Sequence, residues 1–466
     1  MKPIRPQIAW VAFAAAVFVA IAQATPRDSA LTWGRLGAVA LYEPAGPPRE
    51  LVLLLSGDDG WSGDVTDMAR ELAARGALVA GIDMKRFGAA LRDSPDACAY
   101  IPGDLEAFAH DLERRFSFTQ YVNPVLVGYA SGAALAYAAL AQSPPGTFKG
   151  AISLGFCPSL KWDKPLCAGS GPGLVARQDA SGLTLEPAAG LRDRWMALHS
   201  AHDPSCDAAT VRAFTGHMDT ATLIELPGAG QRVSAERDDW PQLVTAFEQL
   251  AAVRSPLVVD APSVSGLPLV EVPARNPARD LFAVMLSGDG GWAGLDRELA
   301  DELATAGVAV VGWDSLRYFW TARTPDGAAA DLARIVRHYR AKWGKTRVVL
   351  IGYSLGADTL PFMVNRLPPD ARAPLALTAL LAPGREAFFE FHVAQWLGRS
   401  GGGLPVIPEL KRLAGSGVLC LHGAEEPDSA CAGLSAPGLH SEQLPGGHHF
   451  DGDYRALARR ILQAIP

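Results

Sequence analysis

Val348-Val-Leu-Ile-Gly-Tyr-Ser-Leu-Gly-Ala-Asp358 is the stretch of sequence that decides the fold. An apolar run typical of a buried strand leads into Gly352-Tyr-Ser-Leu-Gly356, where two glycines flank a serine. The order of buried strand, tight turn and helix start is that of a nucleophile elbow, which points its serine into a pocket. Both glycines lack a Cβ and so relieve crowding around the strained serine backbone. We therefore predict that Ser354 is the nucleophile of an α/β-hydrolase.

The sequence that contains this elbow is one half of an internal repeat. Leu51-Val-Leu-Leu-Leu-Ser-Gly-Asp-Asp-Gly-Trp61 reappears as Phe282-Ala-Val-Met-Leu-Ser-Gly-Asp-Gly-Gly-Trp292, and the same offset carries Gly81 onto Gly312. Each copy has the pattern of an apolar strand, a glycine-rich loop, an amphipathic helix and a second apolar strand. Such alternation indicates a parallel sheet covered on both faces. The predicted fold class is α/β, with two tandem α/β-hydrolase-like, doubly wound domains and mostly parallel sheets.

The repeat and the N-terminal sequence divide the chain into four predicted segments. Residues 1–24 have the pattern of an export signal, with an apolar run after Lys2 and Arg5 and Ala22-Gln-Ala24 as the cleavage site. The other segments are a degenerate first domain (28–254), a linker with the opening strand of the second domain (255–277), and the catalytic domain (278–466). The apolar run has about 15 residues, fewer than the roughly 20 that cross a bilayer. We therefore expect cleavage of the signal after Ala24 and a mature protein that is soluble outside the cytoplasm.

Composition limits the partners. The chain has 466 residues and a net charge of −7 without a run of basic residues, so we expect no nucleic-acid partner. Its six cysteines suit an oxidising compartment, and Cys157/Cys167 and Cys420/Cys431 are close enough in sequence to form short loops, although the pairing stays open. No His/Cys cluster has zinc spacing, so no metal is predicted.

A serine nucleophile needs a base and an acid downstream. The base is expected in Leu444-Pro-Gly-Gly-His-His-Phe450, with His448 as first choice and His449 as the alternative. The acid is expected in the loop after the strand Gly417–His422. We prefer Asp428, because a cysteine follows it three positions later, as Cys206 follows Asp203 in the first copy. Glu426 lies three positions after a glycine, a common spacing, and is the close alternative.

Backbone N–H groups should stabilise the oxyanion of an acyl-transfer transition state. One donor is the N–H of Leu355, and the other is expected from Gly290 or Gly291 in the glycine-rich loop after the earlier strand. Asp289 and Asp358 stand beside these groups in the sequence. Asp358 suits the start of a helix, where the dipole favours a carboxylate.

The first copy has lost its reactive residues. Gly128-Tyr-Ala-Ser-Gly-Ala-Ala134 places Ala130 where Ser354 stands, and Ser131 comes one position too late. The matching loop, Leu226-Pro-Gly-Ala-Gly-Gln-Arg232, has no histidine. We therefore predict that the first domain is inactive and packs on or gates the second.

These motifs resemble the VirJ/AcvB family of bacterial periplasmic virulence proteins. The resemblance rests on Leu286–Trp292, Arg323-Thr-Pro325 with Asp331-Leu332, Gly352–Asp358 and Pro445–Asp451, and the degenerate first domain is similar to that of the long, two-domain form. It implies a periplasmic hydrolase that removes the lysyl group from lysyl-phosphatidylglycerol without a cofactor, with possible ties to type IV secretion components. Ser354 and one of His448 and His449 carry over directly.

Two alternatives remain from the sequence: a non-enzymatic periplasmic adaptor for a secretion system, and a general carboxylesterase or lipase. An aminoacylated phospholipid has a cationic head and a lipid tail. Asp289 or Asp358 is the expected partner of the ammonium group. The aromatic runs Tyr318-Phe-Trp320 and Phe388-Phe389 can line an acyl groove, although such residues are more often core.

Overall fold

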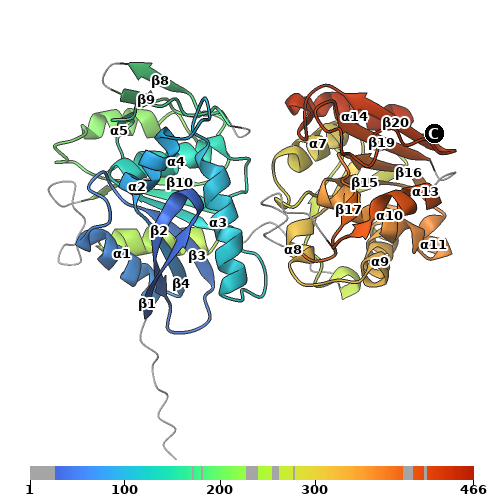
Figure 1. The fold of residues 1–466 in the computed structure, drawn as a ribbon, viewed down its shortest axis with the longest axis horizontal. Coiled ribbons are helices and arrows are strands. Elements are labelled where there is room, and N and C mark those ends of the chain that lie inside the picture. Colours follow the sequence, from blue (N-terminus) through green and yellow to red (C-terminus); the bar gives the residue numbers. More distant parts are fainter. Residues whose placement is uncertain are drawn as a thin grey trace, which may run out of the picture.

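The computed structural model describes residues 27–169, 173–179, 182–226, 240–253, 262–276, 279–391, 402–413 and 417–466. The predicted export signal, much of the linker and the 227–232 loop lie outside the described residues. The chain forms two α/β units, each built on its own sheet (Figure 1). The predicted tandem, mostly parallel α/β architecture is confirmed.

The sheet of the first domain has eight strands in the order β1-β2-β4-β3-β5-β6-β10-β11. β1–β2 and β2–β4 are antiparallel, and all other pairs are parallel. The strands are β1 (Arg27–Trp33), β2 (Gly37–Glu43), β3 (Glu50–Leu55), β4 (Ala77–Ile82), β5 (Val125–Tyr129), β6 (Gly150–Leu154), β10 (Trp195–Ser200) and β11 (Ala221–Leu226). The helices are α1 (Gly63–Ala74), α2 (Met84–Arg92), α3 (Ile101–Arg115), α4 (Ser131–Gln142), α5 (Ala208–Thr215) and α6 (Trp240–Ala251).

A small antiparallel sheet is added to this domain at the β6–β10 connection. It consists of β7 (Ser159–Leu160), β9 (Gly182–Leu185) and β8 (Ala176–Asp179), in that order. In Figure 1, β8 and β9 lie at the edge of the domain, beyond α4 and α5.

The sheet of the second domain has seven strands in the order β12-β14-β13-β15-β16-β19-β20. Only β12–β14 is antiparallel among these pairs. The strands are β12 (Leu269–Val272), β13 (Leu281–Leu286), β14 (Ala309–Trp313), β15 (Arg347–Tyr353), β16 (Leu375–Leu381), β19 (Val418–Gly423) and β20 (Leu439–Leu444), with a hairpin of β17 (Glu386–Ala387) and β18 (Leu404–Pro405) beside them. The helices are α7 (Gly294–Thr305), α8 (Ser315–Phe319), α9 (Pro325–Trp343), α10 (Leu355–Asn365), α11 (Pro369–Arg372), α13 (Val406–Arg412) and α14 (Tyr454–Ala464).

Alternation along β13 shows why the second sheet is covered on both faces. Phe282, Val284 and Leu286 belong to one apolar core, and Leu281, Ala283 and Met285 belong to the other. Successive side chains of a strand point to opposite faces, so a strand that is apolar throughout needs helices on both sides. The uninterrupted apolar strands therefore account for the doubly wound layers.

The repeated tryptophan and glycine pack on each other in both domains. A Cβ at Gly81 would lie 2.0 Å from the Trp61 ring, and one at Gly312 would lie 2.4 Å from the Trp292 ring. Real Cβ atoms do not approach this closely, so only glycine allows the indole to lie flat on the neighbouring strand. The two residues that the repeat keeps in register thus form one packing unit.

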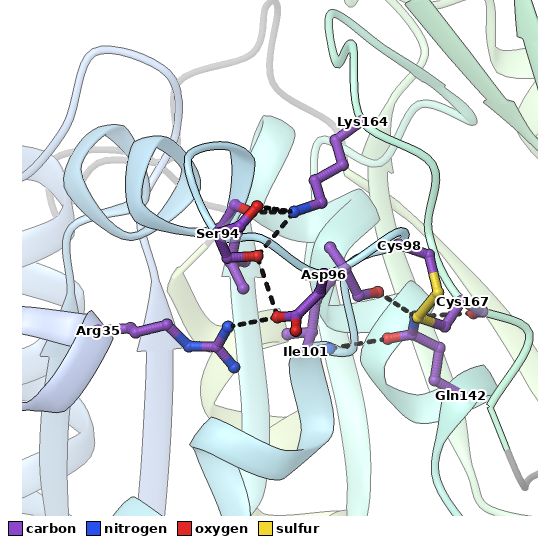
Figure 2. Close-up of a disulfide and its surroundings, with 10 residues drawn as sticks. Arg35, Ser94, Asp96, Cys98, Ile101, Gln142, Lys164 and Cys167 are labelled. Atoms are coloured by element: carbon purple, nitrogen blue, oxygen red, sulfur yellow. Dashed lines mark hydrogen bonds and ion pairs between the residues drawn. A yellow bond between two sulfur atoms is a disulfide. The ribbon is translucent and has the colours of Figure 1, made fainter.

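Three disulfides lie within the domains: Cys98–Cys167, Cys157–Cys206 and Cys420–Cys431. The short loop expected for Cys420 and Cys431 is therefore present, and the one suggested for Cys157 and Cys167 is wrong. Cys157 and Cys167 stand at the two ends of the segment 157–167. Cys157 is bonded to Cys206 and Cys167 to Cys98, both in the first domain. Figure 2 shows the Cys98–Cys167 bond beside Gln142, whose side-chain amide donates to the carbonyls of Ala99 and Cys167.

The first domain packs directly on the second. Tyr121 of the first domain forms a buried apolar cluster with Leu316, Trp320 and Phe391 of the second. The Trp320 indole N–H donates to the Phe118 carbonyl at 2.9 Å. These contacts tie the end of α3 to the segment that contains α8.

Candidate active site

Ser354 occupies the tight turn between β15 and α10. Its backbone angles, φ 51° and ψ −118°, lie in a region where the backbone of a residue with a Cβ is strained. A Cβ at Gly352 would lie 2.5 Å from the Gly356 carbonyl oxygen, and one at Gly356 would lie 2.5 Å from the Leu286 carbonyl oxygen. Both glycines are therefore needed for the strand and helix to meet at this angle. The turn is the elbow that the sequence indicates.

His448 lies in the loop after β20 and faces the serine. Its Nε2 is 2.9 Å from Ser354 Oγ. His449 points elsewhere, with its Nδ1 3.1 Å from the Tyr353 hydroxyl. The structure thus brings the first of the two candidate histidines to the nucleophile.

The acid beside this histidine is Glu426. One of its carboxylate oxygens lies 2.5 Å from His448 Nδ1, and the other accepts a hydrogen bond from the Gly423 N–H at 3.1 Å. The preference for Asp428 is wrong, because its exposed side chain makes no such contact and its carbonyl accepts from Arg385 instead.

The reason for that error lies in the alignment of the two copies. β10 ends at Ser200 and β19 ends at Gly423, so Asp203 and Glu426 each lie three positions after a strand end. The cysteines used to align Asp203 with Asp428 are not equivalent. Cys206 is bonded to Cys157, whereas Cys431 is bonded to Cys420 of its neighbouring strand.

The charges around His448 favour its protonated form. Burial lowers the pKa of His448, but the Glu426 carboxylate, with help from Asp289 and Asp358, outweighs burial and raises it. Burial raises the pKa of Glu426, and the hydrogen bond and charge of His448 outweigh that effect, so the net pKa is lowered. An imidazolium that forms during catalysis would be stabilised by this carboxylate.

Asp358 and Asp289 lie near enough to His448 to raise its pKa. Asp358, in the first turns of α10, accepts a hydrogen bond from the Gly384 N–H at 2.6 Å, and burial raises its pKa to about 8. Burial likewise raises the pKa of Asp289, against the effect of nearby His448. Carboxylates held in this way gain from a cationic ligand, because a positive charge favours their ionised form.

The loop expected to supply an oxyanion donor departs from the prediction. The Gly291 N–H donates to the Gly288 carbonyl at 3.2 Å, so it is not a free donor. The N–H of Gly290 points to the Asp289 carboxylate. Leu355 begins α10, where a backbone N–H has no intrahelical acceptor. Leu355 therefore stays the predicted donor, whereas the N–H of Gly291 is already bonded within its own loop.

Four of the five residues proposed for an acyl groove are core. Tyr318, Phe319, Trp320 and Phe389 are buried, whereas Phe388 is partly exposed. The groove is therefore not formed by these aromatic runs.

Sequence reasoning missed two residues at the site. The Tyr353 hydroxyl contacts both the His448 carbonyl and the His449 ring, and its only sequence signal is the tyrosine shared with Tyr129. Glu106 of α3 places a carboxylate oxygen 3.9 Å from where a Cβ at Gly290 would lie. Burial, with the Asp289 carboxylate, raises the pKa of Glu106 to about 8. Glu106 comes from the other domain, so no local motif around Ser354 or His448 predicts it.

The elbow of the first domain has the same backbone without the chemistry. Ala130 has φ 53° and ψ −118°. Ser131 is the first residue of α4, and its hydroxyl oxygen is buried with no hydrogen-bond partner among the described residues. Within the described residues, no group of three or more His, Cys, Asp or Glu side chains is arranged to hold a metal ion.

The family comparison agrees with this arrangement. A model described as bacterial virulence protein (VirJ) matches residues 49–152 and 280–466, which together are more than half of the chain. The chain belongs to the VirJ family. The VirJ match includes the nucleophile elbow, the His448 loop and Glu426, and it also reaches the first domain up to β6.

Two solved structures similar to this VirJ-family chain each match about half of it. A putative dienelactone hydrolase from Klebsiella pneumoniae is 13% identical and covers 49% of this chain and 99% of its own, with a TM-score of 0.35. Est1E from Butyrivibrio proteoclasticus is 12% identical and covers 48% of this chain and 99% of its own, with a TM-score of 0.33. No match was found among curated proteins.

Proposed function

We propose that the protein is a periplasmic serine hydrolase that cleaves aminoacyl esters, with lysyl-phosphatidylglycerol as its substrate. The observation that carries the proposal is the continuous hydrogen-bonded chain from Ser354 through His448 to Glu426. Nucleophile, base and orienting acid in this order are the requirement for acyl transfer through a serine.

In the proposed mechanism, His448 Nε2 takes the Ser354 hydroxyl proton as Oγ attacks the ester carbonyl. Collapse of the tetrahedral intermediate breaks the ester bond, and His448 returns the proton to the leaving lipid hydroxyl. Water, deprotonated by His448, then attacks the acyl-enzyme and releases the amino acid. Glu426 holds the imidazole in orientation and stabilises its charged form.

The electrostatics of the site support a cationic acyl group. Asp289 and Asp358 lie near enough to His448 to act on its charge, and Glu106 adds a third carboxylate beside the loop of Asp289. Burial is the main cause of the raised pKa of all three groups. A lysyl ammonium bound among them would favour their ionised forms, which a neutral acyl ester cannot do.

The proposed location rests on the N-terminal sequence and the disulfides. The 1–24 segment has the pattern of a cleaved export signal, and three disulfides suit an oxidising compartment. In the part of the chain that the structure describes, no helix is both long and apolar enough to span a membrane. A lipid substrate would be reached at the membrane surface, where type IV secretion components are possible partners.

The test of this proposal is incubation of the mature protein with extracted membrane lipids. We expect lysyl-phosphatidylglycerol to disappear and free lysine to form with the wild type, but not with Ser354→Ala. Ser131→Ala is the matched control, because it removes a serine one position after the inactive elbow. Loss of other lipid esters instead would favour a general carboxylesterase or lipase.

A non-enzymatic adaptor is the second alternative, and a serine-reactive fluorophosphonate separates it from an enzyme. We expect the wild type and Ser131→Ala to be labelled and Ser354→Ala to stay unlabelled. Folded wild-type protein that resists labelling would favour the adaptor.

A further inference from the structure

The degenerate domain keeps a hollow where an active site would lie. A cavity of about 770 Å³ opens over Tyr129, Ala130 and Ser131 and is bounded by the loop Gly57-Asp-Asp-Gly60. A second cavity of about 490 Å³ shares Asp58, Ser131, Leu160 and Lys161 with the first. Each of them has the size of a ligand site. Loss of the reactive residues has thus not been accompanied by closure of the pocket.

The elbow under this cavity is kept in its strained form. Ala130 retains a positive φ of 53° although it has no hydroxyl to present. Such a conformation is strained for a residue with a Cβ, and the surrounding structure must offset that strain. Because the turn is kept, α4 begins at Ser131, which lines the cavity. The first N–H groups of that helix, which have no intrahelical acceptors, therefore adjoin the cavity.

One wall of the cavity is formed by a segment that is held in place at both ends. We name residues 157–167 the strap, and this segment lines the cavity with Ser159, Leu160 and Lys161. The strap is bonded through Cys157 to Cys206 and through Cys167 to Cys98. Two disulfides at the ends of so short a segment leave its backbone little freedom.

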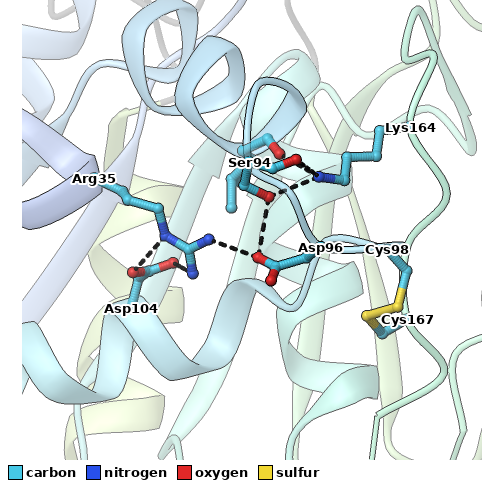
Figure 3. Close-up of polar contacts among 8 residues, drawn as sticks. Arg35, Ser94, Asp96, Cys98, Asp104, Lys164 and Cys167 are labelled. Carbon is cyan, nitrogen blue, oxygen red and sulfur yellow. Dashed lines mark hydrogen bonds and ion pairs between the residues drawn. A yellow bond between two sulfur atoms is a disulfide. The ribbon is translucent and has the colours of Figure 1, made fainter. Parts of the chain in front are cut away.

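Polar contacts fix the middle of the strap as well. The buried Lys164 ammonium donates to the carbonyls of Leu91 and Ser94, at 2.9 Å each, and to the Ser94 hydroxyl at 2.7 Å. Figure 3 shows that the Ser94 hydroxyl in turn donates a hydrogen bond to Asp96, which also forms an ion pair with Arg35. A wall ordered in advance lowers the entropy lost when a ligand binds.

The lining carries charges of both signs. Asp58 and Asp59 lie on the loop that corresponds to the one with Asp289 in the second domain. Lys161 lines both cavities, and Lys85 lines the smaller one. Neither lysine has an ion-pair partner among the described residues. A ligand with an ammonium group and a phosphate group matches this distribution.

We infer that the first domain binds the headgroup of an aminoacylated phospholipid without cleaving it. The inference rests on the proposed function for the substrate class. The carboxylates of Asp58 and Asp59 take the ammonium group, and Lys161 with the start of α4 takes the phosphate. Ala130 in place of a nucleophile leaves the bound ester intact.

The test is titration calorimetry on the mature Ser354→Ala protein. The probe is lysyl-glycerophosphoglycerol in which an amide replaces the cleavable ester. We expect two sites per chain, with one weakened about tenfold by Lys161→Glu. Ala130→Trp, which fills the cavity, should remove the same site. Lys411→Glu makes the same charge change on the exposed face of α13 and should leave both sites unchanged.

A single site that is insensitive to both Lys161→Glu and Ala130→Trp would overturn the inference. Glycerophosphoglycerol, which lacks the ammonium group, should bind the first domain more weakly; equal affinity would overturn the assignment of Asp58 and Asp59. Lysine release by the wild type tests the proposed function separately. Two-site binding without lysine release would overturn the catalytic role and retain the binding site.

Discussion

The two domains carry the same elbow and differ in what stands on it. Ala130 and Ser354 have φ of 53° and 51° and share ψ of −118°. Around each, two glycines let the strand and helix approach, and a tryptophan packs on a glycine of the neighbouring strand. Among the described residues, only the second domain places a serine hydroxyl, a histidine and a glutamate in hydrogen-bond contact. The comparison teaches that the backbone of the elbow can persist when alanine replaces the serine at its apex.

Removal of the nucleophile should have the largest effect. Ser354→Ala should lower ester turnover by on the order of 10⁶-fold, because serine and histidine act as one unit. Ala130→Ser should not create activity in that background, because the first domain lacks the partner histidine. Lysine release from lysyl-lipid vesicles measures both. Turnover restored by Ala130→Ser would contradict the assignment of function to one domain.

Loss of the orienting carboxylate should have the next largest effect. Glu426→Gln should lower kcat by on the order of 10²- to 10⁴-fold, since it removes the acceptor that sets the His448 tautomer. Asp428→Asn is the matched control and should change kcat little, because its side chain does not contact His448. Steady-state kinetics of the two variants decide between them. A larger loss of kcat in Asp428→Asn than in Glu426→Gln would make Asp428 the orienting acid.

The pH profile should report the same carboxylate. His448 must be neutral to accept the serine proton, so activity should rise with pH through its raised pKa. Glu426→Gln removes the main cause of the increase and leaves burial, which lowers the pKa. The acid limb should then move down by about one pH unit. A limb that moves upward or stays fixed in kcat/KM would show that Glu426 does not control the base.

The disulfide of the second domain should affect stability more than rate. Cys420→Ser with Cys431→Ser should lower the free energy of unfolding by about 2–4 kcal/mol, because it releases a closed loop in the unfolded chain. At temperatures where the variant is folded, kcat should change less than about threefold. Chemical denaturation and ester kinetics on the same samples separate the two effects. A loss of kcat without a loss of stability would place this bond in the catalytic machinery.

The sequence by itself determined the architecture and the tight turn that presents Ser354. Uninterrupted apolar strands demand helices on both faces, and the glycines around Ser354 demand a tight turn, so both follow from local chemistry. The repeat added that Ala130 stands at the equivalent turn. These conclusions needed no knowledge of distant contacts.

Only the tertiary structure decided which of the candidate residues contact one another. Glu426 and Asp428 are close in sequence, and the curve of the loop after β19 sets which of them faces His448. The disulfide partners of Cys157 and Cys167 depend on how the strap crosses the first domain. Glu106 reaches the loop of Asp289 because α3 packs against the other domain. Each is a contact between segments that are far apart in the chain, and local sequence patterns do not predict such contacts.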